Sequence, residues 1–270
     1  MTQAVKSRTT RLLLVMGLYF LSVKDMMVKL RLRNLRLDFG SVAMVLSIGL
    51  PASITQVIGP LGLAAVTYFV ASGFQEAGTI AFSIGFRIEF FSFLPAIGFG
   101  AASMAMLGQN IGARNLDRAR EAYRSALLFG AAIGTGLGLV VFVLARPIIA
   151  LFTSDPQVTE YAVSYFRTVP LTYGLFVMMF VEVSSFQGMG KSWYGLGIGV
   201  LRLAVAVPAS YVLVQGDFGI TTVWVAIALS NIVSAAIGYV WIGSRMRRLG
   251  VPEAAPAGAG AVAAVASVEE

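Results

Sequence analysis

An uncharged run from Phe39 to Gln75 constrains this chain more than any other feature of its sequence. About 20 apolar residues suffice for a helix to cross a bilayer core of roughly 30 Å, and this run is longer. More apolar blocks follow, separated by short loops that are alternately basic and nearly uncharged. The pattern predicts an all-α integral membrane protein with several spanning helices and argues against a soluble domain.

Composition supports the same class. Hydrophobic residues make up 57% of the chain and charged residues 12%, about half the charged share of soluble domains. The chain has no cysteine and no histidine, which excludes disulfides, thiol nucleophiles and the usual zinc sites. The net charge is +7, and the basic residues lie in short loops between the apolar blocks. This placement indicates how the spans are oriented in the membrane rather than a nucleic-acid site. We expect a lipid bilayer as partner, and no nucleic acid, cofactor or metal.

Six full spans and one partial span are predicted. The partial span, Leu12–Val23, reaches only about 18 Å as a helix. A signal peptide is the alternative, but no small-residue cleavage site follows, so we interpret it as the end of a shortened helix. The full spans are expected at Val42–Ser72, Ala77–Gly108, Ala122–Ala145, Ala162–Gln187, Trp193–Val214 and Gly219–Gly243.

These spans define three regions. Residues 1–40 hold the partial helix and a basic connector, residues 41–248 the six-helix bundle, and residues 249–270 a low-complexity tail that we expect to be disordered. Within the bundle, Pro51 and Pro60 favour kinks in the first full span. Gly130, Gly134 and Gly138 lie on one helix face, a small-xxx-small spacing that favours close helix packing.

Loop charges predict the orientation of the spans. One set of loops carries almost all the basic residues, and the opposite set offers only Arg146. Because basic loops stay in the cytoplasm, the first set and the C-terminus are expected there, with the chain in the plasma or inner membrane. The basic set is Lys24, Lys29, Arg31, Arg33, Arg36, Arg114, Arg118, Arg120, Arg124, Lys191, Arg245, Arg247 and Arg248.

Charged residues inside the spans are the main functional candidates. A charge at the bilayer centre costs about 2.5–3.5 kcal/mol on insertion scales, so such residues usually face a bundle interior or a water-filled path. Arg87 and Glu89 are two residues apart and should point to different helix faces. Glu182 lies near the cytoplasmic helix end, where it can reach water or pair with Arg202. Structural ion pairing and a direct role in transport both remain open for these residues.

Two uncharged residues, Gln56 and Asn231, are weaker candidates for the same pathway. Interhelical hydrogen bonding is the simpler explanation for each. Between Arg87 and Glu89 on one side and Glu182 on the other, we expect the first two to matter more for transport. They lie about 15 Å or more from the outer end of their helix, near the depth at which transporter sites concentrate.

Several segments resemble the C-terminal lobe of the multidrug and toxic compound extrusion (MATE) transporters. Ile48–Ala52 (IGLPA) is similar to the start of that lobe, and Gly85–Glu89 (GFRIE) with Pro95–Gly98 (PAIG) to its second helix. Gly108–Ala119 (GQNIGARNLDRA) resembles its cytoplasmic loop and is the most specific match. Phe186–Lys191 (FQGMGK) resembles the turn after its fourth helix. The pattern is nearer the DinF-like branch than the NorM-like branch.

The resemblance implies half of a twelve-helix antiporter that exports drugs or other organic cations in exchange for H⁺ or Na⁺. Leu12–Val23 would then be the remnant of the last helix of the first lobe. The cation-binding glutamate of the NorM-like branch is replaced here by Gly59, and the proton-coupling aspartate of the DinF-like branch belongs to the first lobe. Neither site is carried over. Glu182 lies on the helix that holds a cation-binding aspartate in the NorM-like branch, but closer to its cytoplasmic end.

Three functions remain open. The first is a secondary active efflux transporter, present as its C-terminal half and needing a first lobe or a second copy of the chain. The second is a lipid-linked oligosaccharide flippase of the same superfamily, which would require a strongly cationic cavity around Arg87 and Arg202. The third is a non-transporting fragment, because six helices cannot form a cleft between lobes alone. An enzyme is not expected, since no acid–base pair or nucleophile motif is present.

Overall fold

The computed structural model describes residues 39–216 and 218–248, and every regular element in these ranges is a helix. The chain divides into two units, Met1–Met44 and Val45–Glu270, and the packing described below is that of the second. The predicted partial span Leu12–Val23, the basic connector up to Asp38 and the C-terminal tail lie outside the described residues.

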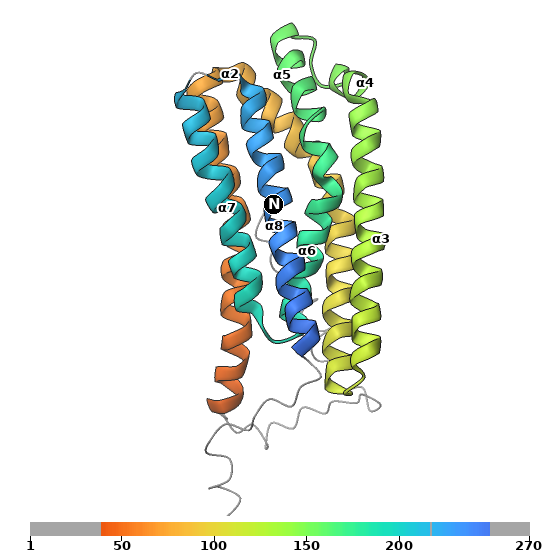
Figure 1. Cartoon of the computed structure of the whole chain (residues 1–270). Helices are drawn as coiled ribbons and strands as arrows, with labels where there is room; N and C mark the ends of the chain where they lie inside the picture. The colour runs from red at the N-terminus through yellow and green to blue at the C-terminus, as the bar shows by residue number, and fades with distance from the viewer. Residues whose placement is uncertain (1–38, 217, 249–270) are drawn as a thin grey trace, which may run out of the picture. The chain divides into compact units, whose positions relative to one another are not determined.

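The longest helix, α2 (Phe39–Gly112), is broken at Gln75, whose φ of 52° and ψ of −145° are not helical. The chain reverses direction there, so that α2 has two antiparallel arms (Figure 1). The arms correspond to the predicted spans Val42–Ser72 and Ala77–Gly108. Backbone angles remain helical at Pro51 and Pro60, where kinks were expected, because membrane helices tolerate proline when neighbouring groups satisfy the freed carbonyls.

Shorter helices follow α2. Asn115 caps the first of them by accepting a hydrogen bond from the backbone N–H of Arg118, and Asp155 caps α5 in the same way from Gln157 and Val158. The elements are α3 (Leu116–Val143), α4 (Ala145–Ala150), α5 (Pro156–Phe166), η2 (Val169–Thr172), α6 (Tyr173–Gly188), α7 (Ser192–Gln215) and α8 (Ile220–Arg248).

Five of the described helical stretches are long and apolar enough to cross a membrane, and one of them, Val45–Gly112, contains both arms of α2. The predicted all-α membrane bundle is therefore confirmed. One span differs in detail, since the predicted single helix Ala162–Gln187 is α5, η2 and α6 in succession. Pro170 lies at this interruption and has no N–H for an α-helical hydrogen bond, so the chain passes through a short 3₁₀ turn.

The glycine face of α3 packs tightly against the start of α6, as its spacing predicted. A Cβ atom on Gly134 would lie 2.9 Å from the carbonyl oxygen of Tyr173, and one on Gly138 would overlap the carbonyl oxygen of Pro170. Gly130 of α3 faces Val177 of α6. The two backbones can approach this closely only without side chains between them.

Buried hydrophobic side chains form two clusters along the bundle. The first cluster is built around Phe82, Tyr165 and Trp224, and the second around Tyr123, Phe176 and Phe186. A polar residue lies between the clusters on each of three helices. On α2 it is Glu89, between Ile84 and Ala96; on α7 it is Arg202, between Val214 and Ile198; on α8 it is Asn231, between Ile227 and Ala235.

The basic loops gather at one end of the bundle. The α2–α3 connection, the α6–α7 connection and the last turn of α8 lie together there, at the bottom of Figure 1. The break at Gln75 and helix α4 lie at the other end. Arg118, Lys191 and Arg247 therefore share one end, as the loop-charge pattern requires, and which end faces the cytoplasm remains a prediction.

Candidate functional site

A carboxyl group and a phenol meet inside the bundle. Glu89 on the second arm of α2 is 5% exposed, and its Oε2 accepts a hydrogen bond of 2.5 Å from the hydroxyl of Tyr165 on α5. The Tyr165 ring is fully buried and packs edge-on against Trp224 at a centroid distance of 5.0 Å. Gly85, one turn before Glu89, leaves room for that ring, since a Cβ there would lie 2.7 Å from it. Aromatic packing thus holds the donor in place.

A second hydrogen-bonded chain fixes a basic group at the same level of the core. Nε of the partly buried Arg202 donates to Oδ1 of Asn231 at 2.9 Å, and Nδ2 of Asn231 donates to Oγ1 of Thr172 at 3.0 Å. The guanidinium carbon of Arg202 lies 5.4 Å from the ring centroid of Phe176, within cation–π distance. The chain joins α7, α8 and η2 and places one positive charge inside the bundle.

The carboxyl group of Glu89 and the guanidinium group of Arg202 interact through their charges without forming an ion pair. Glu89 and Arg202 interact electrostatically, yet the described residues contain no ion pair between them. The hydroxyl of Tyr173 also interacts electrostatically with Glu89, and it has no hydrogen-bond partner among the described residues. We call Glu89, Tyr165, Thr172, Tyr173, Arg202 and Asn231 the polar layer. Its chemistry suits binding of a proton or of a charged group rather than covalent catalysis.

Three of the predicted pathway residues do not join the polar layer: Arg87, Gln56 and, as described below, Glu182. Arg87 is exposed and lines a groove of about 340 Å³ with Thr79, Ser83 and Phe152. It therefore points away from buried Glu89, as expected for residues two apart on a helix. Gln56 is exposed on the first arm of α2. Asn231, in contrast, is fully buried and central to the network, where it makes the interhelical hydrogen bonds that we considered for it.

Glu182 on α6 lies in the second cluster, away from the polar layer. Its side chain is fully buried, and neither carboxyl oxygen has a hydrogen-bond partner among the described residues. Of the two expectations for it, access to water and pairing with Arg202, the structure shows neither, because Arg202 is turned to Asn231 instead. The physical reason is depth: α6 is enclosed by α2, α3, α7 and α8, so a position near its end is still covered.

Sequence reasoning missed the uncharged members of the polar layer. Tyr165, Thr172 and Tyr173 sit around the break between α5 and α6. Tyrosine and threonine are common in membrane helices, so hydropathy gives no reason to single them out. The available signal was Pro170, which interrupts a helix at the depth of Glu89 and frees the chain around it to turn.

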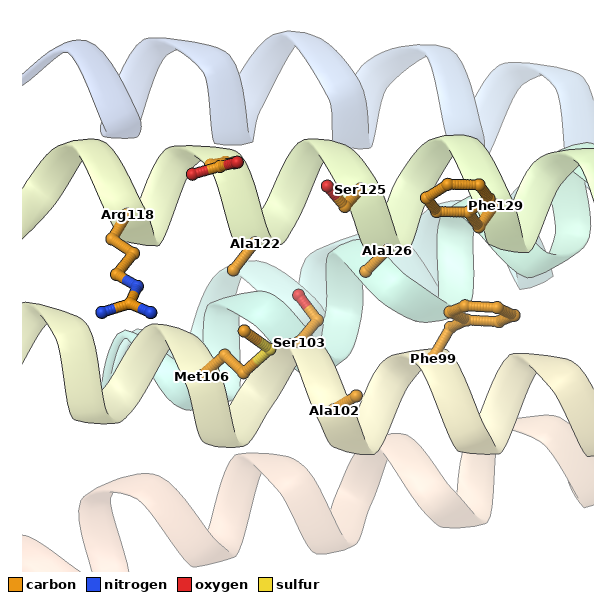
Figure 2. A pocket seen from close by; sticks show the side chains of 10 residues that line it. Phe99, Ala102, Ser103, Met106, Arg118, Ala122, Ser125, Ala126 and Phe129 are labelled. Carbon is orange, nitrogen blue, oxygen red and sulfur yellow. The ribbon is translucent and has the colours of Figure 1, made fainter.

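A groove on the surface lies between α2 and α3. It measures about 410 Å³, and its lining includes the charged residues Arg118 and Glu121 and the rings of Phe99 and Phe129. Figure 2 shows Arg118 and the two rings at opposite ends, with Ser103 and Ala122 between. Neither this groove nor the one beside Arg87 is lined by a residue of the polar layer.

Comparison with known proteins places this bundle in a family. The family model MatE matches residues 51–212. The chain is 25% identical over 224 residues to a probable multidrug resistance protein, YoeA, of Bacillus subtilis, covering 80% of this chain and 48% of the relative. It is 24% identical over 189 residues to an FAD transporter of Shewanella oneidensis, covering 70% and 42%.

Solved structures agree. A multidrug resistance MATE transporter of the MOP superfamily in an outward-facing conformation matches with a TM-score of 0.80 at 25% identity, over 87% of this chain and 53% of that one. The chain thus spans about half the length of the relatives that it matches. Because the family model covers more than half of the chain, and because the bundle agrees with it, this membrane protein belongs to the MatE family.

Proposed function

We propose that this chain is the C-terminal lobe of a secondary active efflux transporter, of the DinF-like branch, that exports drugs or organic cations in exchange for H⁺ or Na⁺. The match to about half of each relative's length supports a single lobe. The segments resembling the second lobe, Ile48–Ala52 and Gly108–Ala119, support its assignment as the C-terminal one.

The observation that carries the proposal is the polar layer between the two hydrophobic clusters. Buried charge is costly in a membrane protein and is usually kept for ion or substrate movement. Here the acid Glu89 and the base Arg202 are held by separate hydrogen-bond partners, Tyr165 and Asn231. A proton arriving at or leaving Glu89 changes the charge that faces Arg202 without breaking a direct ion pair. The same event alters the bond that ties α2 to α5, which offers a route from protonation to helix movement.

Transport by this lobe is expected to need a second lobe. Secondary transporters place substrate between two repeats that rock against each other. The second arm of α2 presents an apolar surface in which Phe90, Phe91, Leu94 and Ile97 are all more than half exposed. We propose that a first lobe, or a second copy of this chain, faces part of that surface and completes the substrate pathway, with the bilayer covering the rest.

Orientation follows from the clustering of basic loops at one bundle end. We propose that the end with Arg118, Lys191 and Arg247 faces the cytoplasm of the plasma or inner membrane, which also puts the C-terminus there. The alternative function, an oligosaccharide flippase, needs a strongly cationic cavity. Arg87 lies outside the polar layer, which leaves Arg202 as the basic residue within it, so the antiporter is the better supported of the two.

Reconstitution into vesicles tests the proposal. A fluorescent organic cation is followed while a pH gradient or a Na⁺ gradient is imposed across vesicles that contain this chain with its partner lobe. Export driven by one of the two gradients supports the antiporter. A stable monomer of this chain that transports unaided would contradict the requirement for two lobes, and transport driven by neither gradient would contradict antiport.

A further inference from the structure

A buried carboxyl group outside the polar layer has no hydrogen-bond partner within residues 39–216 and 218–248. Glu182 on α6 is fully buried, and both of its carboxyl oxygens lack hydrogen-bond partners among the described residues. The hydroxyl of Tyr123 on α3 is likewise buried and unpaired, and it interacts electrostatically with Glu182. Buried polar groups in proteins are nearly always paired, so two unpaired oxygen groups that interact electrostatically mark a site with hydrogen-bonding capacity that the described residues do not fill.

Helix α8 closes the site from another side. Oε2 of Glu182 rests directly against Gly238, so closely that a Cβ at that position would overlap the oxygen. Only glycine permits this contact between α6 and α8. The same imagined Cβ would lie 3.1 Å from Ile198 of α7, which completes an apolar wall. The carboxyl group is therefore sealed by close packing, and a small separation of α6 from α8 would open it.

The described groups around Glu182 offer no positive charge. On α3 the titratable neighbour is Tyr123, and on α8 it is Tyr239, which acts on Tyr123. The contacts from α7 and α2 are uncharged: Gly195 faces Val183, and Ser103 is hydrogen-bonded to Ser185 at 2.7 Å. No described charged side chain acts on the carboxyl group. An ionised carboxylate here would be an uncompensated buried charge, which proteins avoid by keeping the group neutral.

We infer that Glu182 is a second proton-binding site of this lobe, neutral while α6 and α8 are packed at Gly238 and deprotonated when they separate. On release the carboxyl O–H bond breaks, the proton passes to water at the nearby bundle end, and the carboxylate becomes hydrated. Glu182 lies six residues before the end of α6, or about 9 Å at the helical rise, so the path to that end is short. The site is distinct from Glu89 and does not depend on the identity of the exported substrate.

A bound metal ion is a poorer explanation. Calcium and magnesium need several oxygen ligands, and the described residues contain no group of three or more His, Cys, Asp or Glu side chains that could hold a metal ion. A single carboxyl group beside one phenol is enough to hold a proton. The site therefore favours a proton, which neutralises the carboxylate, over a metal ion, which needs several ligands.

Infrared spectroscopy of the purified full chain tests this inference without a transport assay. The carbonyl stretch of a protonated carboxylic acid is separate from the bands of amides and ionised carboxylates. We expect a component of the protonated-acid band at neutral pH that is lost in Glu182→Gln and persists in Glu121→Gln, a matched change at an exposed glutamate near the same bundle end. Loss of an ionised-carboxylate band in Glu182→Gln, with the protonated-acid band unchanged, would overturn the inference.

A second variant keeps the test decisive if Glu182→Gln folds poorly. Gly238→Ala pushes α8 away from the carboxyl group, so the Glu182 component of the protonated-acid band should disappear at a lower pH than in the unmodified chain. Replacing choline chloride by sodium chloride at equal ionic strength should leave the band unchanged. A band that is insensitive to Gly238→Ala, or that is lost on adding sodium, would contradict a proton site controlled by this contact. Because neither result involves transport, failure here is distinguishable from failure of the antiporter proposal.

Discussion

The hydroxyl of Tyr165 donates a 2.5 Å hydrogen bond to Oε2 of Glu89, which ties α5 to the second arm of α2 in the middle of the bundle. The two residues are separated by α3 and α4 in the chain. The bond therefore joins a costly buried acid to a helix that ends where the chain turns toward α6. Any change in the protonation of Glu89 therefore acts directly on this hydrogen bond between α5 and α2.

Removing the Tyr165 hydroxyl should weaken the contact between α5 and α2 but leave the aromatic packing in place. Tyr165→Phe keeps the ring against Trp224 and deletes the hydroxyl. Interhelical hydrogen bonds in membranes average about 0.6 kcal/mol and reach about 1.7, and we expect a loss of stability in that range. Thermal unfolding in detergent measures it. The control is Tyr161→Phe on the same helix, whose hydroxyl has only a 3.3 Å contact with Gln157; a loss as large there would show that the Glu89 bond has no special role.

The charges of the polar layer should be coupled. Glu89→Gln or Arg202→Gln alone leaves one buried charge without its opposite, whereas the double variant removes both. We expect the double variant to be more stable than the sum of the single losses by about 0.5–3 kcal/mol, the usual coupling of neighbouring residues. A double-mutant cycle by chemical denaturation supplies the value. Simple additivity would mean that the two groups do not sense each other.

Close packing of α3 against η2 and the start of α6 gives a sharp contrast between two glycines that are two residues apart. Gly138→Ala places a methyl group on the carbonyl oxygen of Pro170 and should cost about 1–3 kcal/mol by overpacking. Gly136→Ala meets no atom within 4 Å and should be neutral, or stabilising by about 0.5–1 kcal/mol as glycine leaves a helix interior. Melting temperatures of the two variants compare them directly. Equal effects would rule out the tight contact between α3 and η2.

The proposed orientation can be tested because the chain contains no cysteine. Glu76→Cys lies beside the break in α2, and Arg118→Cys lies near the α2–α3 connection at the other end of the bundle. In intact cells an impermeant thiol reagent should label position 76 and leave position 118 unlabelled until the membrane is opened. Labelling of position 118 but not of position 76 would show that the orientation is opposite to the proposed one.

Sequence patterns located the helices better than the contacts between them. The predicted span Trp193–Val214 differs from α7 by one residue at each end, because an apolar run stops at polar residues and glycine. The break in Ala162–Gln187 escaped notice because the prediction followed the mean hydropathy of the whole span and gave no weight to Arg167 and Pro170 within it. Likewise, the bond from Arg202 to Asn231 depends on the register of α7 against α8, which no pattern within one helix encodes. Charge drew attention to Glu89 and Glu182, but only packing shows that, in the part of the chain that the structure describes, Glu89 has a hydrogen-bond partner and Glu182 has none.

In the proposed antiporter, Glu89 couples ion movement to export. The direct measurement is drug export by a complete transporter carrying this lobe with Glu89→Gln, set against Glu76→Gln, an exposed glutamate on the same helix. We predict that Glu89→Gln lowers gradient-driven export by about tenfold or more at unchanged membrane abundance, a typical coupling free energy, and that Glu76→Gln behaves as the unmodified protein. Undiminished export by Glu89→Gln would place coupling wholly outside this lobe and contradict the claim, and a collapse of its abundance would make Glu89 structural.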